Sequence, residues 1–135
     1  MALLTWSDAQ NSGIDATDAE HRGLFDAINA LDAAMGSDQE RQVVAPLLDR
    51  VAEKTRSHFA SEEAVMAYAH YPGSALHALK HKLLLDQISA FVARFERGGS
   101  TLNQHSLNFL RDWCITHLEK DDKQFGQWLN EHSQS

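Results

Sequence analysis

The sequence predicts an all-α protein, an antiparallel up-down-up-down four-helix bundle with an N-terminal arm. Three observations lead to this fold class. Apolar residues recur at spacings of three and four, which places them on one face of a helix. Only two prolines occur in 135 residues, and Gly36, Gly73, Gly98 and Gly99 fall between the apolar segments. No strand-like alternation persists, and short connections favour antiparallel neighbours. The whole chain, 1–135, is therefore expected to be a single domain, with the bundle at about 15–130.

The first helix is expected to begin near Thr17. The segment "TDAE" resembles a capping box, with threonine as the N-cap and Glu20 three residues later. Gly36 is expected to end the helix. Residues 1–14, which include Trp6, are expected to pack as an arm outside the bundle. The apolar face of this helix comprises Leu24, Phe25, Ile28, Leu31 and Met35.

The second and third helices are separated by "YPGS", in which Pro72 and Gly73 interrupt helical structure. The second helix should cover roughly 38–69, and Pro46 should either begin its regular part as the first helical residue or kink it. Ser74 is the natural N-cap of the third helix, which should run to about Arg97, before two glycines.

The fourth helix is expected to open at "TLNQ", a second pattern of the capping-box kind with Thr101 as the N-cap. Apolar and imidazole side chains recur along it at helical spacing. They are Leu102, His105, Phe109, Trp113, His117 and Leu118.

Composition and charge exclude several functional classes. The net charge is −7 with neutral histidines, and the basic residues are scattered, which argues against binding to nucleic acid or to an anionic membrane surface. Cys114 is the only cysteine, so an intramolecular disulfide is impossible. The sequence shows neither a signal peptide nor an apolar run of about 18 residues, and a cytoplasmic location is the default expectation.

Metal-capable side chains occur on all four expected helices. His58 and Glu62 are four residues apart, as are His77 and His81, so each pair can point toward one place in a bundle core. Each signal is weak alone: a single buried histidine such as His21 or His117 is more often a hydrogen-bonded core residue. Glu62 and Glu63 would fit a solvated helix edge equally well. The conjunction of these signals on four helices favours a metal centre.

The donor types indicate which metals suit the centre. Five imidazoles with a few carboxylates and no thiolate cluster suit iron, zinc or manganese better than copper(I). One zinc ion usually takes fewer histidines, so two metal ions are the more plausible content.

With these residues in hand, the chain resembles the hemerythrins, and most closely the single-domain bacteriohemerythrins. The resemblance covers almost the whole chain. The segments that carry it are "HRGLFDAINAL" at 21–31, "HFASEEAVM" at 58–66, "YPGSALHALKH" at 71–81 and "WCITHLEKDDKQF" at 113–125.

The resemblance implies a non-haem di-iron site with an oxo or hydroxo bridge, at which dioxygen is the ligand. His77, His81 and His117 would bind one iron, and His21 and His58 the other. Glu62 and Asp122 would bridge the two ions. The walls of the dioxygen pocket would be Leu24, Phe59, Trp113, Cys114 and Leu118.

One implied ligand conflicts with regular helix geometry. Asp121 follows His117 by four residues and would share its face, whereas Asp122 follows by five and would lie ~140° away around an α-helix. The family pattern nevertheless points to Asp122. We therefore predict that the helix widens or breaks between His117 and Asp122, for example as a π-type turn. The other charged residues of "EKDDK" are expected on a solvated face.

The chain departs from the family pattern at three positions: Thr17, which replaces a usual aliphatic residue, Glu20 and Cys114. Glu20 stands where the family usually has glutamine, and Cys114 stands where it usually has an aliphatic residue. Cys114 is read as a small hydrophobe, with an effect of the thiol on oxygen retention or autoxidation as the alternative. His70, His105 and His132 match no ligand position and are expected to be surface or capping residues.

The leading functional hypothesis is a dioxygen-binding protein that acts as a carrier, a store or an oxygen-delivery module for an oxygen-consuming or redox partner protein. The principal alternative is a di-iron oxidase or peroxidase, or a redox sensor of nitric oxide or oxygen. The repeated Glu-x-x-His motif of ferritin-like di-iron enzymes is absent, which disfavours that class. A zinc or iron storage bundle is a third, weaker reading.

Overall fold

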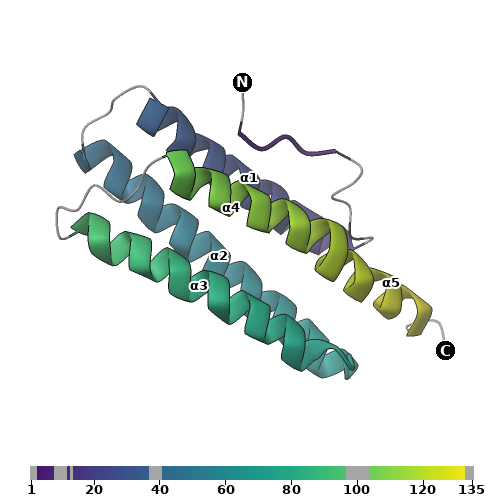
Figure 1. The fold of residues 1–135 in the computed structure, drawn as a ribbon. Helices are drawn as coiled ribbons and strands as arrows, with labels where there is room; N and C mark the ends of the chain where they lie inside the picture. The colour runs from purple at the N-terminus through teal and green to yellow at the C-terminus, as the bar shows by residue number, and fades with distance from the viewer. Residues whose placement is uncertain (1–2, 8–11, 13, 37–40, 97–103, 133–135) are drawn as a thin grey trace.

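A computed structural model of the chain confirms the antiparallel four-helix bundle (Figure 1). It describes residues 3–7, 12, 14–36, 41–96 and 104–132. Three of the helices are uninterrupted: α1 (Asp15–Gly36), α2 (Arg41–Ala69) and α3 (Ser74–Glu96). The fourth is composite, with α4 (Gln104–Thr116), a π-helical turn η2 (His117–Asp122) and α5 (Lys123–His132) following one another directly. Helix α1 packs against α2 and α4, and α2 packs against α3.

The start of α1 differs from the predicted capping box. The helix begins at Asp15, so Thr17 lies inside it and is not the N-cap. Local polar contacts explain the earlier start. Asp18 Oδ1 accepts hydrogen bonds from both the backbone N–H and the hydroxyl of Ser12, and the Ser12 hydroxyl in turn accepts one from the Ile14 N–H. Glu20 is not engaged at the helix start, because its carboxylate faces α2.

Helix α2 contains Pro46 as its sixth residue, so this proline does not mark the first helical position. The helix ends at a left-handed residue, His70, whose φ is 58°. The Tyr71 N–H donates to the Met66 carbonyl, and the His70 N–H donates to the Ala67 carbonyl. These two bonds form a Schellman motif, which usually has glycine at this position. His70 is thus a capping residue, as predicted.

Helix α3 includes Ser74 as its first residue, so Ser74 is not the N-cap as predicted. The carbonyl of Gly73 accepts the first helical hydrogen bond, from the His77 N–H, so Gly73 precedes the helix as its cap. The predicted N-cap Thr101 and the expected end of the third helix at Arg97 lie outside the described residues.

The N-terminal arm is anchored along α1. The Leu4 backbone N–H donates to Asn29 Oδ1 at 2.8 Å, and Asn29 Nδ2 donates back to the Leu4 carbonyl at 2.8 Å. The Leu4 side chain belongs to the buried core, and Trp6 packs edge-on against Phe25. The arm therefore packs outside the bundle as predicted, and it also contributes the Leu4 side chain to the buried core. None of the described helices is long and apolar enough to cross a membrane.

The core has two unlike parts. From the middle of the bundle to the end where α1 finishes, it is apolar and contiguous, with Leu31, Leu48, Leu84, Ile88, Leu107 and Leu110 all 2% exposed or less. Towards the other end it is filled by buried histidines and carboxylates. Beyond that polar layer, Met66 and Phe125 are buried but do not belong to the contiguous apolar cluster.

Candidate metal centre

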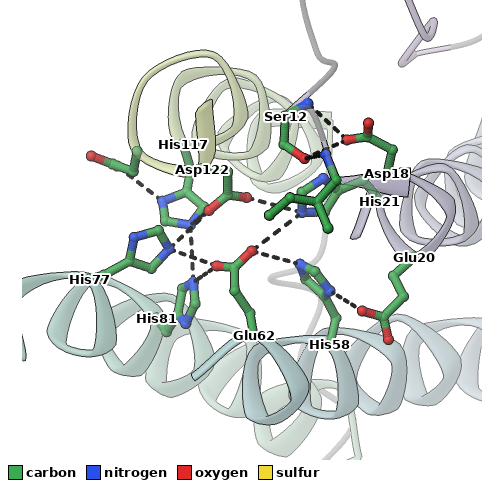
Figure 2. A network of polar contacts seen from close by, with 12 residues as sticks. Ser12, Asp18, Glu20, His21, His58, Glu62, His77, His81, His117 and Asp122 are labelled. Carbon is green, nitrogen blue, oxygen red and sulfur yellow. Dashed lines mark hydrogen bonds and ion pairs between the residues drawn. The ribbon is translucent and has the colours of Figure 1, made fainter. Parts of the chain in front are cut away.

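The seven residues predicted as metal ligands converge in the polar layer of the core (Figure 2). Each is 4% exposed or less, and all four helices contribute. They form two groups that could each hold a metal ion, with donor atoms within 4.8 Å of one another. The larger group comprises Glu62, His77, His81, His117 and Asp122, and the smaller comprises His21, His58, Glu62 and Asp122.

Two carboxylates belong to both groups, and each divides its oxygens between them. Glu62 Oε1 lies 2.7 Å from His77 Nε2 and 3.3 Å from His81 Nε2. Its second oxygen, Oε2, faces the other group, 3.7 Å from His58 Nε2 and 4.0 Å from His21 Nε2.

Asp122 repeats this division from the opposite side. Its Oδ1 lies 2.9 Å from both His77 Nε2 and His117 Nε2, and its Oδ2 lies 3.0 Å from His21 Nε2. One oxygen per group on each of two carboxylates is the arrangement that can bridge two cations.

The helix geometry around Asp122 confirms the predicted widening. Residues His117–Asp122 form a π-helical turn, which places one extra residue in the turn and brings Asp122 back to the face of His117. As a result, Asp122 contacts His117 from inside, and Asp121 contacts it from outside. The Asp121 Oδ2 accepts a hydrogen bond from His117 Nδ1–H at 3.0 Å. The π turn thus lets consecutive aspartates serve opposite nitrogens of one imidazole.

Outer carboxylates fix the tautomer of three histidines. His58 Nδ1 lies 3.0 Å from Glu20 Oε1, His81 Nδ1 lies 3.0 Å from Glu63 Oε2, and His117 has the bond to Asp121. An ionised carboxylate only accepts, so each Nδ1 must hold the proton. In the neutral imidazole, Nε2 is then a bare lone pair directed into the centre.

Two of those lone pairs face each other. His81 Nε2 and His117 Nε2 are 3.0 Å apart, although both protons are committed to Nδ1. Either one imidazole takes up an extra proton, or a cation must lie near both nitrogens.

Six buried nitrogen and oxygen atoms of this layer lack a hydrogen-bond partner among the described residues, namely His21 Nδ1, His21 Nε2, His58 Nε2, Glu62 Oε2, Asp122 Oδ1 and Asp122 Oδ2. Buried polar atoms without partners are costly, and metal ions would satisfy all but His21 Nδ1.

In the metal-free layer, the buried carboxylates and imidazoles shift each other's pKa values. Burial would raise the pKa of Asp122, but contacts with the imidazoles of His117, His21 and His77 hold it well below its usual range. Burial would lower the pKa of His77, but Asp122 and Glu62 raise it to about 9. Burial, together with the charge of His21, lowers the pKa of His58. The carboxylates are therefore ionised at neutral pH, as metal ligands must be.

A small apolar cavity of about 10 Å³ lies beside the smaller group. All five predicted pocket walls line it, together with His21, His58, His117 and Asp122. Those walls are Leu24, Phe59, Trp113, Cys114 and Leu118. A cavity of this volume admits only a very small molecule unless its walls move. A larger groove, of about 790 Å³, opens at the surface along α4 and η2 and meets the donor groups only at His117.

Of the remaining expectations for residues near the site, some are confirmed and one is wrong. His70, His105 and His132 are exposed and stand apart from both donor groups. Within "EKDDK", Glu119 and Lys120 are exposed, but Asp121 is not on a solvated face as expected. It also accepts a hydrogen bond from Lys80 of α3 at 2.7 Å. Sequence reasoning missed the outer role of Asp121, Glu63 and Glu20. The signal was available for Asp121 alone, four residues after a candidate ligand.

Comparison with known proteins agrees with this geometry. Residues 12–129 match the family described as the hemerythrin HHE cation binding domain. The chain is 34% identical to a bacteriohemerythrin of Stenotrophomonas maltophilia over 98% of this chain and 85% of the relative. It is 32% identical to a bacteriohemerythrin of Methylococcus capsulatus over 96% of this chain and 99% of the relative. A crystal structure of wild-type hemerythrin superposes with a TM-score of 0.87 at 31% identity, covering 93% of this chain and 97% of that one.

Proposed function

The chain belongs to the hemerythrin family, and from this premise we propose that it binds dioxygen reversibly at a non-haem di-iron centre, as an oxygen carrier, store or delivery protein. His77, His81 and His117 would hold one iron, His21 and His58 the other, and Glu62 and Asp122 would bridge them. The observation that carries the proposal is the division of the Glu62 and Asp122 oxygens between the two histidine groups.

The protein buries these donors and lines the adjoining cavity with apolar side chains. Iron, when bound, supplies the electrons that hold dioxygen reversibly. The two carboxylates offset part of the cationic charge, which would otherwise be costly in a buried place. The smaller group has two histidines against three in the larger one, so it has fewer protein donors and more room for an external ligand.

The cavity favours binding over turnover of an organic substrate. It adjoins the smaller group and is lined by the apolar side chains of Leu24, Phe59 and Leu118. Its volume of about 10 Å³ admits a diatomic molecule but no organic co-substrate. An oxidase would need a second, larger space next to the reactive ion.

The proposal is tested by loading the purified protein with iron, reducing it without oxygen, admitting air, and removing the oxygen again. We expect two irons per chain and a visible absorption band that appears with air and disappears on deoxygenation. Glu62→Gln should abolish the band. Glu53→Gln on the same helix should not, because Glu53 is exposed and pairs with Arg56 away from the donor groups. Irreversible conversion with consumption of a reductant or release of peroxide would instead favour an oxidase, a peroxidase or a redox sensor.

Cys114 offers a separate test of the cavity. Its side chain is 3% exposed, and burial raises the pKa of its thiol to about 12, so it stays protonated and acts as a small hydrophobe. Replacing it with leucine adds volume to a cavity of only about 10 Å³. We expect Cys114→Leu to leave the iron content unchanged and to change the oxygen off-rate, measured by stopped-flow absorption. An unchanged off-rate and autoxidation rate would remove any special role for this residue.

A further inference from the structure

Three carboxylates outside the donor groups hold histidines of the centre in place. We propose that Glu20, Glu63 and Asp121 are positioning residues, and that Glu20 determines whether the smaller group, His21 and His58, retains its metal ion. The inference rests on the proposed metal centre but not on dioxygen binding. It concerns side chains that touch no ion themselves.

Each of these carboxylates bonds the ring nitrogen that faces away from the centre, at 3.0 Å in all three cases. The bond fixes both the ring orientation and the proton on Nδ1, which leaves Nε2 free to bind a cation. The contribution of such bonds is large where the imidazole has no other polar anchor.

The two donor groups differ in how many of these anchors they have. In the larger group, Glu63 anchors His81 and Asp121 anchors His117, and Asp121 is itself held by Lys80. In the smaller group, Glu20 anchors His58 alone. His21 Nε2 lies 3.0 Å from Asp122 Oδ2 within the centre, but the other ring nitrogen, Nδ1, is buried and has no hydrogen-bond partner among the described residues. The smaller group therefore depends on a single outer bond.

The position of Glu20 gives that bond a second consequence. Glu20 immediately precedes His21 on α1, and it grips His58 on α2 (Figure 2). One hydrogen bond thus links the two helices that supply the histidines of the smaller group. Its side chain is 40% exposed, so the anchor lies at the rim of the bundle and can be replaced without disturbing the core.

The test uses cobalt(II) as a redox-stable probe added to the metal-free, full-length protein under competition with a chelator. Equilibrium titration should resolve two ions per chain in the unaltered protein. In Glu20→Ala we expect one class of site to weaken by about 10- to 100-fold, as is usual when an outer partner of a metal-bound histidine is lost. The cobalt affinity of Glu20→Gln should lie between those of the unaltered protein and Glu20→Ala, because an amide oxygen can still accept the hydrogen bond from His58 Nδ1–H.

Controls identify which ion is affected. Asp26→Ala removes a carboxylate from an exposed position on the same helix and should leave both affinities unchanged. The visible absorption of cobalt remaining in Glu20→Ala should match that of His58→Ala, in which the smaller group is incomplete. Glu63→Ala should weaken the other class of site. Thermal unfolding of the metal-free variants should match that of the unaltered protein.

The outcomes separate the two proposals. Two ions of unchanged affinity in Glu20→Ala would overturn the inference and leave the metal centre intact. Equal weakening of both sites, or weakening that tracks lost metal-free stability, would show a general structural role and also overturn it. If the unaltered protein bound no cobalt at these residues, the metal centre itself would fail.

Discussion

The two halves of the bundle are built from the same helices but do opposite things. Where α1 ends, the core is closed by Leu31, Leu48, Ile88, Leu107 and Leu110, which are buried, apolar and in mutual contact as one cluster. Where α1 begins, the same helical faces present five imidazoles and two carboxylates, several of whose buried atoms lack partners. The first half stabilises the fold, and the second half is costly until a cation satisfies it.

This difference explains how a small protein maintains a polar interior. Burying apolar side chains contributes about 25 cal/mol per Å². The apolar half, with the small buried patch of Met66 and Phe125 on the other side, holds the helices in place. The polar layer between them is therefore pre-organised, and metal ions need not fold the chain around themselves.

The largest expected effect on stability comes from a substitution in the apolar half. Leu107 is 0% exposed, so Leu107→Ala leaves a cavity there and should lower the free energy of unfolding by about 2–5 kcal/mol. Metal stoichiometry should stay at two, because the donor groups lie in the other half. Urea unfolding of the metal-free protein measures the loss. A smaller loss than that of an exposed Leu83→Ala control would contradict the assigned role of this half.

The next effect tests how the arm meets the polar half. A Cβ added at Gly126 would lie 1.9 Å from the Ser12 carbonyl oxygen, a contact between backbones that cannot relax cheaply. Gly126→Ala should displace the arm and cost about 1–3 kcal/mol. The fluorescence of Trp6, measured in a chain with Trp113 and Trp128 replaced by phenylalanine, should report the displacement. Gly23→Ala is the matched control, since its Cβ would meet only Lys54 Nζ at 3.7 Å.

The polar half should also make the metal-free protein sensitive to pH. The pKa of His77 is about 9 in the folded chain, against 6.5 for an unperturbed histidine. A raised pKa means that the folded state binds more protons, so this contribution is complete below pH 6.5 and is lost as the pH rises toward 9.

We expect the metal-free protein to lose about 2 kcal/mol between pH 6.5 and 8.5. Asp122 and Glu62, with lowered pKa values, stay ionised throughout this window. Chemical unfolding at several pH values measures the loss, and loading with metal should abolish it, because the ion displaces the proton. Stability that rises with pH would contradict the assigned ionisation of His77.

The smallest expected effect concerns His70, which belongs to neither the apolar half nor the polar half of the core. His70 occupies a left-handed conformation with φ 58°, which is strained for a side chain with a Cβ. His70→Gly should stabilise the protein by about 0.5–1 kcal/mol without changing its metal content. The midpoint of thermal unfolding measures the gain. An equal gain in His105→Gly, where the residue is helical, would show that the effect is not conformational.

The sequence by itself determined the helices and most of the donor set. Apolar spacing, turn residues and the pairs His58–Glu62 and His77–His81 are local properties, because a helix fixes which residues share a face. The family resemblance added the π turn, because it assigned Asp122 as a ligand, and His117 and Asp122 could share a face only if the helix departed from regular α geometry. The start of α1 was wrong because it depends on side-chain contacts, such as that of Ser12 with Asp18. The start of α3 was wrong because the Gly73 carbonyl accepts the first helical hydrogen bond, and spacing encodes neither feature.

The family resemblance implied which donors belong together, but only the tertiary structure decided how each carboxylate is turned and what holds the histidine rings. Which oxygen of Glu62 faces which histidines depends on the relative rotation of packed helices, and no local pattern specifies it. The anchors Glu20 and Glu63 bond histidines 38 and 18 residues away in sequence. Such bonds exist only after packing has brought two helices together, so the outer part of the centre was beyond the reach of the sequence.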